Sequence, residues 1–331
     1  MLEQEHDLAS FRRHRGVTLH GMAARRASHV RAGKFTATSQ RKSRGSRYTC
    51  VTPGSTNQKW SIGIVVPVSE RRTQRIQLGL QMAEVAGHMS RQHFDTRSLR
   101  VQTKADGSPV TEADRDIEQY LRTAVSTEFG DDAFFGEEYP DIDGDSGYRW
   151  IVDPIDGTKS FIRGVPLYAN LIALQEGDEI VFGIINMPSA RVIVHAERGK
   201  GCWKNGARVT VSTRDVLDGA YVMATWLEDW DPEVIGDLHT QGVVLRTWGD
   251  AFGYAMVACG LADAVVDYTA QPFDLAPMSV IIEEAGGRFS SLDGRRVFDG
   301  RNGIASNGLL HDALLSYVAP GIRHRAQGIR K

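Results

Sequence analysis

Cysteine and long apolar runs are scarce in this chain, and each shortage excludes a class of protein. Only three cysteines occur among 331 residues, Cys50, Cys202 and Cys259, and they are too scattered for a disulfide framework or a zinc site. No run of about 18 apolar residues occurs, so neither a transmembrane helix nor a membrane partner is expected. A reducing, cytoplasmic location is the default expectation. With 41% hydrophobic residues, the chain can bury one large core or two layered lobes.

Basic residues are scarce outside the first 67 positions. Residues 1–67 hold 12 Lys and Arg against 3 acids, whereas residues 68–331 hold 27 against 38. Because phosphate contacts need clustered Lys and Arg, this acidic body predicts no nucleic-acid partner. The first segment has no apolar periodicity and is predicted to be a disordered basic tail. It could be an organellar transit segment, a nucleic-acid-binding arm, sequence upstream of the true start codon, or a flexible tail with no part in the chemistry.

Hydrophobic periodicity from Val68 onward predicts two lobes, residues 68–212 and 213–331. The first lobe is expected to be α+β, with a helix over 69–94, a second helix capped by Thr111, and an antiparallel meander. The meander strands are expected at 171–175, 179–186, 191–197 and 201–203. The second lobe is expected to contain strands at 221–224, 242–246 and 264–268 and helices at 232–241, 251–261 and 274–285.

The run Trp150–Thr158 places two carboxylates, a glycine and a hydroxyl at the end of an apolar strand. A proline in this run cannot extend a central ladder, so the chain is expected to turn where Asp153 and Asp156 lie. Two carboxylates there suit Mg²⁺, which proteins hold through one or two carboxylates, waters and substrate phosphate oxygens. Gly157 permits close approach of a ligand, and Thr158 could cap a helix whose N-terminus binds an anion. The alternative is an ordinary acidic turn.

Two further acidic segments occur at similar element ends. The aromatic strand at 134–136 leads into Glu137, and Asp274 stands in the first turn of a predicted helix. Taken singly, Glu137 could be a solvated loop residue and Asp274 a plain N-cap. Together with the run Asp153–Thr158, in this order and spacing, they resemble the inositol monophosphatase family of Mg²⁺-dependent, lithium-sensitive phosphomonoesterases. The resemblance covers about residues 69–318.

This resemblance implies both a fold and a metal site. The family fold is α+β, a layered αβαβα sandwich of the inositol monophosphatase and fructose-1,6-bisphosphatase type, with the active site between lobes. On the matching positions, Glu137, Asp153 and the Ile155 carbonyl would hold one Mg²⁺. Asp153 would also bridge to a second ion, which Asp156 and Asp274 would bind. A homodimer is a further expectation from the family.

The resemblance also implies how water is activated. Asp114 matches the acid that hydrogen-bonds the motif threonine, Thr158. This pair and Glu137 would orient and deprotonate the attacking water. Two metal ions about 3.5–4 Å apart can stabilise the attacking and leaving oxygens of an in-line displacement, so no covalent phosphoenzyme is needed. Ser160 and Phe273 depart from the commonest family residues, but neither change removes a ligand.

Around the leaving group, the sequence is similar to the histidinol-phosphatase branch of the family. The similar features are the acid Asp250 after a glycine, Tyr254 four residues later, and the Lys-Ser pair after Thr158. Asp267 matches the acid that contacts the leaving portion of the substrate. The expected substrate-binding residues are therefore Gly157, Thr158, Arg246, Asp250 and Asp267. The alternatives are that Asp250 caps a helix, that Tyr254 is part of the core, and that Arg246 is a surface or structural residue.

The expected function is hydrolysis of a small-molecule phosphate monoester, L-histidinol phosphate, to L-histidinol and phosphate, the penultimate step of histidine synthesis. An inositol or broad sugar monophosphatase is the alternative. An inactive homologue that acts as a binding protein is a remote one. The inactive homologue is disfavoured because the chain retains several converging acids, which a non-enzyme would have no physical need to keep.

Overall fold

The structure of the protein, a computed structural model, describes residues 68–94, 99–105 and 107–328. The predicted basic tail, residues 1–67, lies outside the described residues. All described residues fall within one unit that spans Gly63–Lys331. The helices are α1 (Val68–His93), α2 (Glu112–Glu128), α3 (Thr158–Phe161), α4 (Pro232–Thr240), α5 (Asp250–Ala258), α6 (Pro272–Glu284) and α7 (His311–Gly328), with a 3₁₀ turn η1 (Leu227–Asp229).

The first sheet has seven strands in the order β3-β4-β5-β6-β7-β8-β9. Its strands are β3 (Ala133–Gly136), β4 (Tyr148–Asp156), β5 (Ala169–Glu176), β6 (Glu179–Met187), β7 (Val192–Glu197), β8 (Gly201–Lys204) and β9 (Ala207–Val209). β3 and β4 are parallel, and every later pair is antiparallel, so the predicted meander is confirmed. A separate two-stranded sheet, β1 (Val101–Thr103) and β2 (Pro109–Thr111), leads into α2.

The second sheet has five strands in the order β11-β10-β12-β14-β13. They are β10 (Tyr221–Ala224), β11 (Val244–Arg246), β12 (Ala264–Asp267), β13 (Arg288–Ser290) and β14 (Gly303–Ser306). β10 pairs in parallel with β11 and β12, whereas β14 is antiparallel to both of its neighbours. The second half of the chain is thus a mixed α/β layer rather than a meander.

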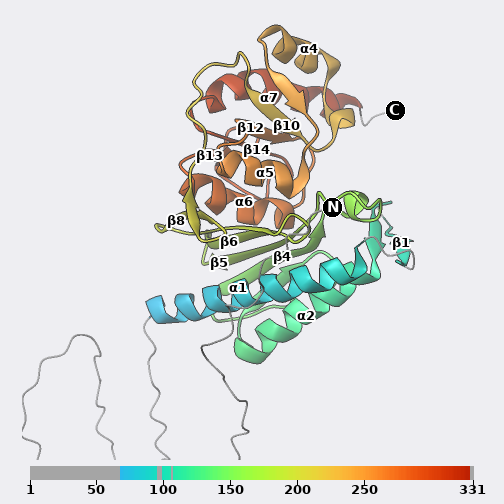
Figure 1. Cartoon of the computed structure of the whole chain (residues 1–331), viewed down its shortest axis with the longest axis vertical. Helices are drawn as coiled ribbons and strands as arrows, with labels where there is room; N and C mark the ends of the chain where they lie inside the picture. The colour runs from blue at the N-terminus through green and yellow to red at the C-terminus, as the bar shows by residue number, and fades with distance from the viewer. Residues whose placement is uncertain (1–67, 95–98, 106, 329–331) are drawn as a thin grey trace, which may run out of the picture. The chain divides into compact units, whose positions relative to one another are not determined.

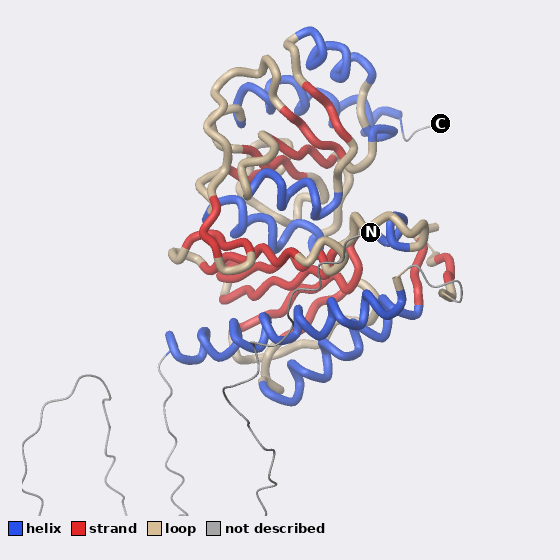
Figure 2. Tube along the Cα trace, viewed as in Figure 1, coloured by secondary structure: helices blue, strands red, loops and turns tan. Residues whose placement is uncertain are grey.

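Helices and sheets alternate in five layers (Figures 1 and 2). Helices α1 and α2 cover one face of the seven-stranded sheet, α5 and α6 lie between the two sheets, and α4 and α7 cover the far face of the five-stranded sheet. This αβαβα order confirms the predicted fold. The basis is the two-residue alternation of strand side chains, visible in β4: Trp150 and Val152 belong to the core beneath α1 and α2, and Ile151 to the core around α5 and α6.

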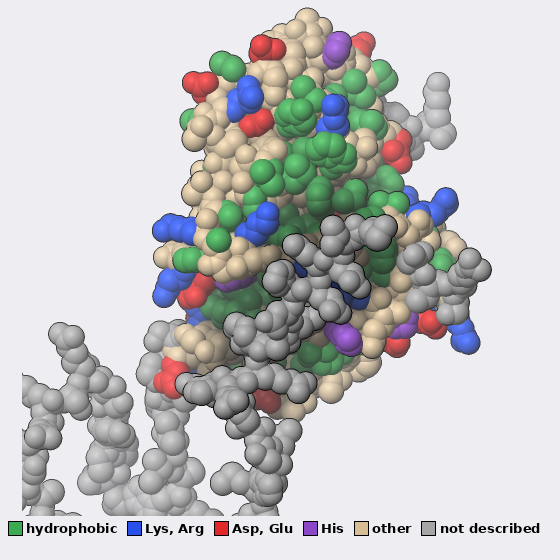
Figure 3. All heavy atoms as spheres, viewed as in Figure 1, with side chains coloured by type: hydrophobic (Ala, Val, Ile, Leu, Met, Phe, Trp, Pro, Cys, Tyr) green, Lys and Arg blue, Asp and Glu red, His purple; other side chains and the backbone are tan. Residues whose placement is uncertain are grey.

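Among the described residues, no helix combines the length and apolar character that a membrane span requires. Figure 3 shows one face of the molecule, on which hydrophobic side chains gather in the upper part. The described Lys and Arg side chains visible on this face lie mostly apart from one another, so no extended basic surface forms in that view.

Candidate active site

A β-bulge at the end of β4 brings the two motif aspartates to the same place. Asp153 pairs with Leu171 of β5 and Asp156 pairs with Ala169, so three residues of β4 advance against two of β5. In a regular strand, residues three apart point to opposite faces, and the extra residue cancels this alternation. The strand runs on through Asp156, so the predicted turn at Asp153 is wrong. The intervening proline is tolerated because it lies in the bulge.

Asp153 and Asp156, which are buried, form a carboxylate cluster with the half-buried Asp274. One ligand oxygen from each lies within 4.8 Å of the others. Asp153 is only 3% exposed, and its Oδ1 has no hydrogen-bond partner among the described atoms. Burial, and then repulsion from neighbouring acids, raises the pKa of Asp153 well above its usual range, and burial raises that of Asp274 to about 7. Such a cluster is a favourable place for a cation.

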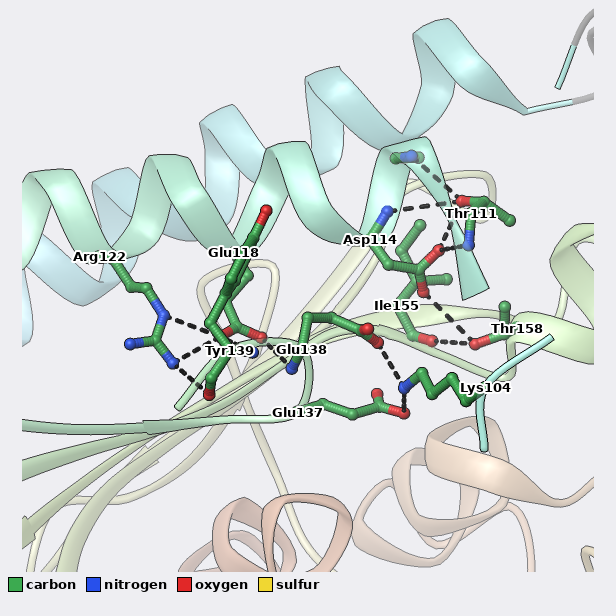
Figure 4. A network of polar contacts seen from close by, with 11 residues as sticks. Lys104, Thr111, Asp114, Glu118, Arg122, Glu137, Glu138, Tyr139, Ile155 and Thr158 are labelled. Carbon is green, nitrogen blue, oxygen red and sulfur yellow. Dashed lines mark hydrogen bonds and ion pairs between the residues drawn. The ribbon is translucent and has the colours of Figure 1, made fainter. Parts of the chain in front are cut away.

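Glu137 lies on the same cavity wall and is paired with a lysine (Figure 4). Lys104 donates from Nζ to Glu137 Oε1 and to Glu138 Oε1, each at 2.6 Å. Burial alone would lower the pKa of Lys104, but these two carboxylates raise it. Burial also raises the pKa of Glu137, while Lys104 opposes that rise. An ammonium group therefore lies against one of the predicted metal ligands.

A buried ion pair holds the segment that carries Glu137. Arg122 donates to Glu118 Oε1 at 2.8 Å, and the Glu138 amide donates to Glu118 Oε2 at 2.7 Å (Figure 4). A Cβ on Gly136 would lie 2.4 Å from Glu118, so only glycine fits there. Sequence reasoning missed Lys104, Glu118 and Arg122 as parts of the site. Glu118 and Arg122 are an i,i+4 pair within α2, but their bonds to residues 138–140, like the bond of Lys104 to Glu137, join segments that meet only in the fold.

Asp114 and Thr158 meet as the resemblance implied. The Thr158 hydroxyl lies 3.0 Å from the Ile155 carbonyl oxygen and 3.5 Å from Asp114 Oδ1 (Figure 4). Asp114 is held at the start of α2 by the predicted cap, since its Oδ2 accepts from the Thr111 amide at 2.8 Å. Burial raises the pKa of Asp114 to about 6, against the effect of the bonds from Thr111.

Gly157, rather than Thr158, is the N-cap of α3. Gly157 has φ 77°, and a Cβ there would lie 2.8 Å from the Leu167 carbonyl oxygen. Thr158 is the first helical residue, so its predicted capping role is wrong, and its hydroxyl is directed to Ile155 and Asp114 instead. The helix has only four residues, so its dipole adds little to anion binding.

These residues border one cavity of about 740 Å³. The predicted site residues in its lining are Glu137, Asp153, Ile155, Asp156, Gly157, Thr158, Asp250 and Asp274. Lys104, Lys159, Trp226 and Arg301 also line it and were not predicted. The cavity therefore joins the carboxylate cluster to a wall built from the loop after β10 and the start of α5.

Asp250 and Asp267 have different positions at this wall. Asp250 lines the cavity with φ 49°, an uncommon backbone conformation for a residue other than glycine. Burial raises its pKa to about 7. Asp267 borders a smaller cavity of about 40 Å³ instead. Its carboxylate accepts from the Thr225 amide at 3.2 Å and from the Tyr254 hydroxyl at 2.8 Å, so Tyr254 is a buried partner of Asp267.

Arg246 lies away from the cavity. It is the last residue of β11, it is exposed, and its guanidinium stacks over Trp248 and Tyr221 at 6.0 and 5.8 Å from the ring centroids. The described residues thus bring together eight of the predicted site residues in one lining, with Asp114 directly behind Thr158. They place Asp267 behind the wall and Arg246 outside it.

Comparison with known proteins identifies the family of this chain. Residues 71–323 match the inositol monophosphatase family. The histidinol-phosphatase of Chlorobaculum parvum is 40% identical over 76% of this chain and 100% of its own length, and that of Mycobacterium tuberculosis is 37% identical over 74% and 98%. The extragenic suppressor protein suhB from Bartonella henselae has a similar structure, with a TM-score of 0.68 and 30% identity over 74% of this chain and 98% of its own. The chain belongs to the inositol monophosphatase family.

Proposed function

We propose that this protein is a Mg²⁺-dependent phosphomonoesterase that hydrolyses L-histidinol phosphate to L-histidinol and phosphate. The observation that carries the proposal is the carboxylate cluster of Asp153, Asp156 and Asp274 in one cavity with Gly157 and Thr158. The family supports the class of reaction. The names of the two relatives support histidinol phosphate as the substrate.

The donor set fits a hard divalent cation. Every candidate ligand is an oxygen, and the buried Asp153 Oδ1 has no hydrogen-bond partner in the described part of the chain. Glu137, Asp153 and the Ile155 carbonyl would hold one ion, and Asp153, Asp156 and Asp274 a second. When bound, Mg²⁺ would neutralise phosphate charge and lower the pKa of a coordinated water.

The protein's own groups would orient the reactants and move the proton. Gly157 adopts the left-handed backbone conformation that starts α3 at the edge of the cavity. Glu137 and the Thr158 hydroxyl, backed by Asp114, border the place from which water would attack. With its pKa raised to about 6, Asp114 is ionised at neutral pH yet basic enough to accept a proton through Thr158. Asp250 would face the cationic leaving group, and Asp267 would hold Thr225 and Tyr254 around it.

A substrate panel tests the proposal. Phosphate release should be measured from histidinol phosphate, inositol 1-phosphate and glycerol 1-phosphate, with Mg²⁺ and with EDTA. We expect histidinol phosphate to have the highest kcat/KM and EDTA to abolish all three activities. A preference for inositol 1-phosphate would overturn the substrate, and activity in EDTA would overturn the metal requirement.

Three finer features belong to the same proposal. We propose a homodimer, which light scattering would check, and a cytoplasmic location, which imaging of the full-length chain would check.

We also propose that the two lobes meet near residue 212, between the last strand of the seven-stranded sheet and the first strand of the five-stranded sheet. Limited proteolysis around residues 213–219 would check that boundary.

A further inference from the structure

Trp226 presents an aromatic ring at the cavity wall. It is the second residue after β10, is half-buried, and lines both the large cavity and the smaller one behind it. Phe273 is the other described aromatic residue in the large lining, but it packs against Phe135, with ring centroids 5.9 Å apart. Trp226 is therefore the aromatic side chain available to a ligand at this wall.

The Trp226 ring already lies against a cation. Lys159 Nζ lies 3.7 Å from its centroid, and Lys159 also lines the cavity. Tryptophan is the best aromatic side chain for such contacts, because its face carries negative electrostatic potential. The Lys159 ammonium therefore covers one face of the ring, which shows that a positive group can lie against it.

Hydrogen bonds of the neighbouring residue hold the segment that carries Trp226. The preceding residue, Thr225, donates its amide to Asp267 and accepts from the Asp250 amide through Oγ1 at 2.8 Å. A Cβ on Gly249 would lie 2.3 Å from Thr225 Cα, so the end of β10 and the start of α5 are in close backbone contact. Trp226 and Asp250 therefore lie on the same wall of the cavity, at the ends of two segments that are held together.

We propose that Trp226 is a specificity-determining residue, whose ring stacks on the flat cationic ring of the substrate's leaving group while Asp250 supplies the opposite charge. This inference rests on the proposed function, since an imidazole with an unperturbed pKa of about 6.5 is such a ring. A leaving group with neither ring nor cation gains nothing from this wall. The ring thus discriminates between phosphate esters that share the same phosphate-binding groups.

The test compares two substrates in three variants. In Trp226→Leu, kcat/KM for histidinol phosphate should fall by about 5- to 30-fold, while that for glycerol 1-phosphate changes less than about twofold. Trp226→Phe keeps an aromatic face and should lose less than about fivefold on histidinol phosphate. Trp248→Leu is the matched control, because Trp248 is 40% exposed, stacks with Arg246 and lies outside the lining. It should leave both values unchanged.

A second readout is inhibition by histidinol itself, which carries the cationic ring without phosphate. Its Ki should rise in Trp226→Leu by the same factor as the loss in kcat/KM. Equal losses on both substrates, or an unchanged ratio between them, would overturn the role of Trp226. A wild-type enzyme that does not prefer histidinol phosphate to glycerol 1-phosphate would instead overturn the proposed function, so the two failures are distinguishable.

Discussion

The carboxylates of the site are held in an arrangement that is unfavourable without a cation. Asp153, Asp156 and Asp274 lie within 4.8 Å of one another in a largely buried setting, and burial raises the pKa of each. Buried like charges cost stability, so their retention indicates a function rather than a structural need. Lys104 offsets part of this charge by pairing with Glu137 and Glu138. Both observations lead to predictions at single residues.

Asp153→Asn should keep the fold and lose the metal-dependent behaviour. The variant loses the negative carboxylate charge that two ions would share. Losing electrostatic stabilisation of this kind lowers kcat on the order of 10²–10³-fold or more. Its Tm in EDTA should not fall below that of the wild type, but the rise in Tm on adding Mg²⁺ should disappear. Asp141→Asn, at an exposed pair with Arg149, is the control and should change neither quantity. Activity near the wild-type value at saturating Mg²⁺ would disprove the bridging role.

Lys104→Gln should lower the stability of the metal-free protein and strengthen the binding of Mg²⁺. Without Mg²⁺, removing the ammonium leaves Glu137 and Glu138 unpaired, so the Tm in EDTA should fall. With Mg²⁺, the ion no longer competes with Nζ for Glu137, so its Kd from calorimetry should fall several-fold. Lys200→Gln, at an exposed turn, serves as the charge-matched control. A weaker Mg²⁺ affinity in Lys104→Gln would show that the lysine supports the metal site instead.

At the scale of whole elements, the sequence predicted the meander and the capped helix α2 well, because each depends on local signals. The Thr111 capping box and the turns between β5, β6 and β7 are read within a few residues. It did not predict β13, β14 or α7. β13 and β14 have three and four residues, too short for an alternation, and they join the sheet through pairing of β14 with β12 and of β13 with β14, which are contacts between segments separated in sequence.

The same limit applies to the site. The run Asp153–Thr158 has a sequence signature, and its residues do line the cavity. The β4 bulge, the Lys104 pairing and the position of Trp226 have none, since each depends on contacts between distant segments. Asp267 was expected in the cavity, but its hydrogen bonds to Thr225 and Tyr254 turn it to the smaller space behind.

His311 joins α7 to the edge of the five-stranded sheet and should make stability depend on pH. It is fully buried, with Ser290 Oγ 3.0 Å from Nε2 and Ser306 Oγ 2.9 Å from Nδ1. Burial lowers its pKa to about 4, so the folded state favours the neutral ring. The contribution of His311 to the free energy of unfolding is therefore fully present above the unfolded pKa of about 6.5. It is lost as the pH falls from there through the folded pKa of about 4, because the unfolded chain binds the proton first.

The His311→Gln variant should remove this dependence. Urea unfolding at about pH 7.5 and pH 5 should show that the wild type loses about 2 kcal/mol more than the variant between these values. The difference between proteins is the relevant quantity, because the buried acids act in the opposite direction, gaining stability as the pH falls. His239→Gln, on the exposed side of α4, should behave as wild type. Parallel pH profiles for wild type and His311→Gln would contradict the assignment.

At the scale of the whole chain, the catalytic unit and the basic segment are separable in sequence. The family match begins at residue 71, α1 begins at Val68, and the described lining of the large cavity lies between Lys104 and Arg301. The 12 basic residues of segment 1–67 all precede these positions. The described elements of the αβαβα sandwich and the described lining therefore follow the segment, and we expect the chemistry to need none of its charges.

A protein that begins at Val66 should fold and keep full phosphatase activity. We expect kcat/KM for histidinol phosphate and the Tm with Mg²⁺ to match those of the full-length chain within about twofold and about 2 °C, because the family match and the described elements begin after Val66. Retention on a heparin column should distinguish the two proteins, since removing residues 1–65 leaves 27 basic against 38 acidic residues. The full-length protein should be retained and the shortened one should flow through. A shortened protein that is insoluble, or a first segment that resists limited proteolysis while the core is intact, would show that these residues are part of the structure.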